Sequence, residues 1–395
     1  MVELGISTFG ETTPLEKTGE TYSHDERIRQ LVKEIELADA VGLDVYGIGE
    51  HHREDFAVSA PEIVLAAGAV NTKHIKLTSA VSILSSMDPV RLYQQYTTID
   101  ALSNGRAEIM AGRGSFTESF PLFGYDLHDY EELFDEKLDM LLEIGKETNL
   151  KWDGHFTQSV DNKPVYPRPV QEDFPIWVAT GGNVESTIKI AKKGLPIVYA
   201  VIGAGAHRFK PLVDAYRKVA RNSGHDPKKT KVAAHSWGWI ADDHDKAVEE
   251  YYHPTKVITD NIAKDRPHWS EMTKAQYLYS LTDEGATIVG DPKRVAEKII
   301  KTIETLDLDR FFLHLPIGSM PHEDVLRAIE LYGKEVVPIV RDYFAKKKRI
   351  SPRTDEIKRM GRYNSLTSLK WSQHLSAVVD WKICSCFTLH IFLYG

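Results

Sequence analysis

Residues 45–52 have the sequence VYGIGEHH, in which a short apolar run ends on one carboxylate and two imidazoles. The run at 45–49 has the length and composition of a buried β-strand, so Glu50, His51 and His52 follow directly at its carboxyl end. In a parallel α/β barrel, the carboxyl ends of the strands form the functional face. Two imidazoles beside a carboxylate are costly to bury for packing alone, which makes this strand end the first candidate for chemistry.

Seven further apolar or β-branched runs are similar to this strand, and helical patterns separate them. Strict alternation of strands and helices predicts parallel strands joined by right-handed crossovers. Eight such units predict closure into a (β/α)8 TIM barrel. A doubly wound open sheet is the competing architecture, but the first strand lacks the glycine-rich turn of a dinucleotide-binding site. The predicted strands are residues 2–8, 45–49, 75–81, 107–111, 176–179, 197–201, 232–240 and 310–314.

Two of the predicted units are longer than a barrel requires, and the chain continues past the last unit. The extra residues after the fourth strand, about 151–174, are rich in proline and predict an inserted hairpin or loop. Those after the seventh strand, about 261–290, are polar and aromatic and predict a loop that acts as a lid. The barrel accounts for residues 1–344. Residues 345–395 start with a basic run and show no clear period, so we expect a disordered or appended tail.

Composition narrows the class of protein. The 395 residues are 42% hydrophobic and 27% charged, as in an ordinary globular protein. The net charge of -8 argues against a nucleic-acid partner. No apolar run is long enough to cross a membrane, and the N-terminus lacks the pattern of a secretion signal. The two cysteines, Cys384 and Cys386, lie near the C-terminus, so we expect a cytoplasmic protein.

Three further strand ends carry residues that suit a ligand. Small residues near the end of the third strand would let a flat ligand approach the backbone. Arg113 lies between two glycines after the fourth strand and can hold a phosphate with a forked pair of hydrogen bonds, although a surface salt bridge is the simpler interpretation. After the fifth strand, glycines and hydroxyl residues precede a helix, where free N–H groups favour an anion; a capped turn at Asn183 is the alternative. The candidates at these three ends are Ala80, Val81, Arg113, Gly181, Gly182, Ser186 and Thr187.

The histidines raise the question of a metal. Adjacent side chains on extended backbone point in opposite directions, so His51 and His52 could not easily share one ion. We therefore expect no metal, and an acid–base role or a cofactor contact instead. His235 and Trp237 share one face of the seventh strand, but such residues more often pack in a core than catalyse.

The order and spacing of five motifs resemble the bacterial luciferase-like flavin monooxygenases, over residues 1–344. The motifs are 42–46 (GLDVY) with 50–52 (EHH), 88–91 (DPVR), 102–106 (LSNGR) with 112–114 (GRG), 175–179 (PIWVA) with 181–182 (GG), and 290–292 (GDP). The resemblance implies a (β/α)8 barrel that binds reduced FMN, or in one branch the deazaflavin F420, at the carboxyl ends of its strands. Gly112 stands where luciferase itself has a cysteine, which argues against light emission.

The resemblance also implies roles for individual residues. His51 corresponds to an acid–base histidine near flavin and substrate, with Glu50 and His52 as its neighbours. Ala80–Val81 corresponds to a non-prolyl cis peptide beside the isoalloxazine, and Arg113 to an arginine that holds the FMN phosphate. The start of the phosphate-binding helix corresponds to Gly182, Ser186 and Thr187, just after Gly181, and the mobile lid corresponds to residues 261–290.

These inferences predict a flavin-dependent monooxygenase that uses reduced FMN and O2 to oxidise a small organic substrate. A separate flavin reductase would supply the reduced FMN, because the sequence has no nicotinamide fingerprint. Three alternatives stay open: F420-dependent hydride transfer on the same barrel, a non-catalytic flavin-binding protein, and a metallohydrolase. By resemblance alone we expect a homodimer.

Overall fold

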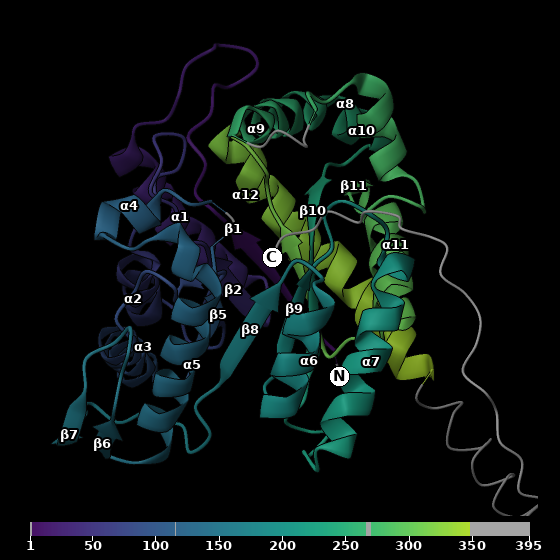
Figure 1. Cartoon of the computed structure of the whole chain (residues 1–395). Coiled ribbons are helices and arrows are strands. Elements are labelled where there is room, and N and C mark those ends of the chain that lie inside the picture. Colours follow the sequence, from purple (N-terminus) through teal and green to yellow (C-terminus); the bar gives the residue numbers. More distant parts are fainter. Residues whose placement is uncertain (1, 115, 266–269, 348–395) are drawn as a thin grey trace, which may run out of the picture.

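The computed structural model describes residues 2–114, 116–265 and 270–347. Eight parallel strands form a closed barrel, because β1 pairs with β2 on one side and with β12 on the other. Helices surround the barrel (Figure 1). The predicted TIM barrel is therefore confirmed, and the open sheet is wrong. The barrel strands are β1 (Glu3–Thr8), β2 (Val45–Ile48), β3 (Lys76–Ser79), β5 (Ala107–Gly112), β8 (Ile176–Thr180), β9 (Ile197–Ala200), β10 (Val232–Ile240) and β12 (Arg310–His314).

Capping residues set the starts of the helices. Asp291 accepts hydrogen bonds from the first backbone N–H groups of α11, and Pro292 takes a position where no N–H is needed. Asn183 caps α6 in the same way. The larger helices are α1 (His24–Ala40), α2 (Pro61–Asn71), α3 (Pro89–Ser103), α5 (Tyr130–Lys146), α6 (Val184–Lys193), α7 (Lys210–Asn222), α9 (Tyr252–Asp265), α11 (Pro292–Leu306) and α12 (His322–Leu331). Shorter elements are β4 (Ser82–Ile83), α4 (Ser119–Phe123), η1 (Leu127–Asp129), η2 (Ala206–Arg208), α8 (His244–Glu250) and η3 (Tyr332–Val336).

The two predicted insertions differ in outcome. The first forms an antiparallel hairpin of β6 (Asn149–Trp152) and β7 (Val160–Pro164), as predicted. The second was predicted as a loop, and this is wrong for much of its described part, which holds α10 (Lys274–Leu281) and β11 (Ile288–Gly290). A capping box between Thr273 and Gln276 begins α10, a local signal that favours helix over loop.

A layer of inward-facing side chains closes the barrel below the strand ends. Six of the eight strands contribute one side chain each, and Ala80, Val81 and Ala179 pack on top. Deeper in the barrel, the Arg310 guanidinium pairs with Glu108 at 2.5 Å. The barrel is therefore filled, and ligand space is left only above this layer. The layer consists of Val45, Met110, Trp177, Val198, Ala233 and Phe312.

Two sequence expectations concern regions outside the barrel. Among the described residues, no helix combines the length and the apolar content that a membrane span requires. The predicted tail at 345–395 lies outside the described residues except for 345–347, which are helical.

Candidate functional site

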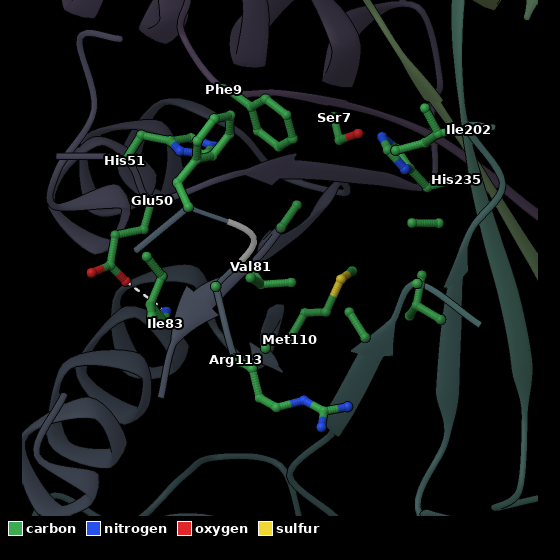
Figure 2. Close-up of a pocket in the computed structure, with 18 of the residues that line it drawn as sticks. Ser7, Phe9, Glu50, His51, Val81, Ile83, Met110, Arg113, Ile202 and His235 are labelled. Carbon is green, nitrogen blue, oxygen red and sulfur yellow. Dashed lines mark hydrogen bonds between the residues drawn. The ribbon is translucent and has the colours of Figure 1, made fainter. Parts of the chain in front are cut away.

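A cavity of about 250 Å³ opens above the inward-facing layer, at the carboxyl ends of the barrel strands (Figure 2). Its walls are mainly apolar, with Val81 and Met110 near the centre. Polar groups stand at its edges, where His51, Arg113 and His235 all line the same space. Strand ends that are distant in the sequence therefore meet at one site, as the barrel predicts.

The structure separates the three residues at the end of β2. The buried Glu50 carboxylate accepts a hydrogen bond from the Ile83 N–H at 2.8 Å (Figure 2) and lies 2.8 Å from Nε2 of His52. The His52 ring faces Glu50 and Phe123 and does not line the cavity. Glu50 thereby ties β2 to β4, while His51 is the imidazole of this motif that reaches the cavity.

His51 lies among three aromatic rings. Its ring stacks on Phe56 at 4.2 Å, and Phe9 and Phe116 approach it edge-on at 4.7 and 5.1 Å. The Nδ1 atom is buried and has no hydrogen-bond partner among the described residues. The rings thus fix the imidazole while leaving this nitrogen unused.

Glu118 is a neighbour of His51 that the sequence analysis missed. Its Oε1 lies 3.8 Å from His51 Nδ1, beyond hydrogen-bond distance. Burial alone would raise the pKa of Glu118, but His51 and the His52 backbone N–H, 3.3 Å away, lower that pKa below its ordinary value. Glu118 is therefore ionised at neutral pH and would stabilise a proton on His51. No motif in the sequence connects these two positions.

Arg113 and Ser186 come from different strand ends and meet at another edge of the cavity, which Arg113 lines. Arg113 Nη2 donates to the Ser186 hydroxyl, in the first turn of α6. Arg113 Nη1 donates to both carboxylate oxygens of Glu131, at 2.5 Å to Oε2. A guanidinium at a helix N-terminus is a site suited to an anionic group. The predicted pairing of arginine and helix start is present, and Glu131 is an addition that the sequence analysis did not foresee.

The other predicted phosphate contacts lie at different depths. Gly181 lines the cavity, whereas Gly182 does not. Gly182 has φ +107°, a backbone conformation that favours glycine, so the turn before α6 requires a glycine at this position. Thr187 is buried, and its hydroxyl donates to the Asn183 carbonyl at 2.9 Å. Contacts of Gly182 and Thr187 with a phosphate stay predictions.

The Ala80–Val81 peptide bond is cis, as expected, and both residues line the cavity. Val81 packs against Gly112 of β5. A Cβ at position 112 would lie 2.5 Å from Val81 Cγ2, so a larger residue there would displace Val81. Gly112 therefore allows this close approach of two strand ends.

His235 of β10 faces the cavity on the side opposite His51 (Figure 2). Its Nε2 is buried without a hydrogen-bond partner among the described residues. Burial, and then the neighbouring His314, hold the pKa of His235 well below its usual range. Behind it, the buried His314 lies 3.2 Å from Glu11 and 3.3 Å from Ser7. The shared strand face of His235 and Trp237 was the only sequence signal for this wall.

Within the part of the chain that the structure describes, no cluster of three or more histidine, cysteine or acidic side chains could hold a metal ion.

Comparison with known proteins places this site in a family. The sequence model of the luciferase-like monooxygenases matches residues 2–309. The chain belongs to the luciferase-like monooxygenase family. Family membership supports an oxidoreductase.

Individual relatives of this luciferase-like protein are distant. It is 25% identical to the N-acetyl-S-alkylcysteine monooxygenase of Bacillus subtilis, over 76% of this chain and 90% of the relative. The oxygenating constituent of 3,6-diketocamphane monooxygenase from Pseudomonas putida, solved with FMN, has a TM-score of 0.67 and 20% identity, covering 86% and 99% of the chains. The F420-dependent tetrahydromethanopterin reductase of Methanopyrus kandleri has a TM-score of 0.64 and 20% identity, covering 85% and 99%. At such identities the two structures establish the fold alone.

Proposed function

We propose that this luciferase-like protein is a monooxygenase that uses reduced FMN and O2 to oxidise a small organic substrate. One observation carries the proposal: a single cavity has an anion site at one edge and a buried histidine beside a carboxylate at another. An apolar wall that includes the cis Ala80–Val81 peptide lies between them. When bound, reduced FMN supplies the electrons with which molecular oxygen is activated.

The edge at Arg113 suits the phosphate of such a cofactor. The Arg113 guanidinium would bind the phosphate oxygens, and the Ser186 hydroxyl would add a hydrogen bond at the start of α6. The apolar side chains of Val81 and Met110 would contact the flat ring system. These residues bind and orient; they transfer no proton.

The edge at His51 suits proton transfer. The His51 imidazole, which lines the cavity, would accept or return a proton at a substrate or cofactor atom there, and the Glu118 carboxylate, 3.8 Å from Nδ1, would stabilise the protonated ring. Phe9, Phe56 and Phe116 keep water away from the imidazole. Glu50, predicted as a catalytic neighbour, would act by positioning β4.

Helix α9, which leads into the second insertion, forms part of the cavity wall. Ile258 and Ile262 of α9 line the cavity and would keep water out while substrate is bound. The names of relatives support oxygenation of small molecules, as with the N-acetyl-S-alkylcysteine monooxygenase. A separate flavin reductase would deliver the reduced cofactor, and a homodimer stays part of the proposal.

F420-dependent hydride transfer is the second candidate, because structural neighbours on this barrel include F420-dependent enzymes. Two imidazoles that line the cavity, those of His51 and His235, argue against a protein that only stores flavin.

The proposal is tested by measuring the binding of FMN, riboflavin and F420 through the quenching of fluorescence. We expect FMN to bind at micromolar concentrations and at least about tenfold more tightly than riboflavin, because only FMN offers a phosphate to Arg113. Arg113→Ala should remove this preference while leaving riboflavin binding unchanged. Reduced FMN under O2 should then support product formation from candidate substrates. If neither FMN nor F420 binds at micromolar concentrations, the proposal is wrong; tighter binding of F420 would favour the second candidate.

A further inference from the structure

We infer that Glu131 is a built-in competitor for the cofactor phosphate, which limits how tightly the cofactor is held and promotes its exchange. This inference rests on the proposed function, because it concerns the same anion site. It assigns a role in cofactor affinity to a residue that lies beside the cavity and that no motif singles out.

The contacts of Arg113 carry the inference. Nη1 donates to both oxygens of Glu131, and Nη2 donates to the Ser186 hydroxyl, so both terminal nitrogens of the guanidinium are engaged. The guanidinium also makes a cation–π contact, since its central carbon lies 5.6 Å from the centre of the Phe134 ring. The arginine is thus held in place and its charge is neutralised by a carboxylate.

A phosphate cannot bind the edge of Arg113 formed by its two terminal nitrogens while Glu131 remains on Nη1. The carboxylate occupies one terminal nitrogen, and its negative charge would lie within contact distance of the incoming phosphate. Like charges at that separation repel strongly in a partly buried site. Binding of the phosphate at this edge therefore requires Glu131 to leave Arg113.

Departure of Glu131 is feasible because its side chain is the more exposed partner. The Glu131 side chain is 40% exposed, compared with 12% for Arg113. Glu131 also lies in the first turn of α5, where the helix dipole favours a negative charge without the arginine. Glu131 can turn to solvent, while Arg113 stays on the Phe134 ring to receive the phosphate.

This exchange of anions suits a cofactor that arrives from a separate reductase and leaves after turnover. When the phosphate departs, Glu131 returns to Arg113, so that the partly buried guanidinium again has a negatively charged partner. The carboxylate therefore weakens binding and accelerates release. A tightly retained cofactor would need no such competitor.

Glu131→Gln tests the inference, with Glu132→Gln as the matched control. Both changes remove one negative charge from the first turn of α5, but Glu132 is exposed and makes no contact with Arg113 in the described structure. For Glu131→Gln we expect FMN to bind about tenfold more tightly and to dissociate more slowly, with riboflavin affinity unchanged within about twofold. Glu132→Gln should leave the ratio of FMN to riboflavin affinity at the wild-type value. Equilibrium quenching and stopped-flow release measure these quantities.

Weaker FMN binding by Glu131→Gln would overturn the inference and show that the carboxylate instead positions Arg113. An unchanged ratio would overturn it as well. In a second experiment, the melting temperatures of wild type, Glu131→Gln and Glu132→Gln are measured at increasing concentrations of inorganic phosphate. A ligand that binds the folded state raises the melting temperature. If no flavin binds but phosphate stabilises Glu131→Gln more than wild type, the competitor role holds and the proposed cofactor is wrong. If phosphate also shows no difference, both are wrong.

Discussion

His51 and His235 face one cavity from opposite sides, yet their charged surroundings differ. A carboxylate of Glu118 lies 3.8 Å from His51 Nδ1. His235 instead has a second imidazole, that of His314, with ring centres 5.1 Å apart. Both histidines are enclosed and both have a nitrogen without a partner among the described residues.

The comparison leads us to propose that the neighbouring charge, more than burial, determines which of the two histidines acts in proton transfer. Of the two imidazoles, only that of His51 has a carboxylate beside it, with Glu118 Oε1 3.8 Å from Nδ1. The pKa of His235 falls well below its usual range because burial is joined by His314. His235 therefore forms a neutral part of the cavity wall, and under the proposed function His51 would be the residue that carries a proton.

The largest expected effect comes from His51→Gln. If His51 carries the proton, turnover with reduced FMN should fall by about 10²- to 10⁴-fold. FMN affinity should stay within about twofold, because Arg113 and Ser186 form the anion site. Steady-state rates and flavin titration of the same preparation check this. The control is His128→Gln, because His128 is exposed. Undiminished turnover by His51→Gln would show that His51 does not carry the proton.

A smaller effect is expected from Glu118→Gln, which keeps the shape of the side chain and removes its charge. Without the carboxylate, a proton on His51 is less stable, so the acidic limb of the pH–rate profile should move to lower pH by about one unit. A profile measured from pH 5 to 9, with FMN saturating, shows the shift. An unmoved limb would mean that the 3.8 Å contact has no electrostatic role.

The sequence alone located the site residues that lie at strand ends. Buried barrel strands are apolar runs, so their ends, including His51 and Arg113, could be located by pattern alone. Glu118, just before α4, and Glu131, in the first turn of α5, both follow β5, and only tertiary packing brings them to the two strand-end residues. Side chains that approach across helices leave no period or motif in a single sequence.

The error in the second insertion has a similar origin. Its polar and aromatic composition favoured a loop, but the capping box at Thr273 begins α10. His235 was predicted to be a core or surface residue and not a catalyst, because strand alternation gives its face and not the empty space beside it. Where a cavity opens depends on the sum of packed volumes, which no local pattern records.

The smallest expected effect concerns stability and comes from His235→Gln. Because the folded state keeps His235 neutral, only the unfolded chain takes up a proton as the pH falls below about 6.5. The unfolded state then binds more protons, so wild-type stability decreases on acidification, by about 1.4 kcal/mol from this group between pH 7.5 and 5.5. Glutamine does not titrate and lacks this loss. Urea titrations at pH 7.5 and 5.5 give the unfolding free energies of wild type and variant. Relative to wild type, the variant should be more stable at pH 5.5 than at pH 7.5 by about 1.4 kcal/mol. A difference that is the same at both pH values would show that folded His235 accepts a proton, and the two histidines would then be alike.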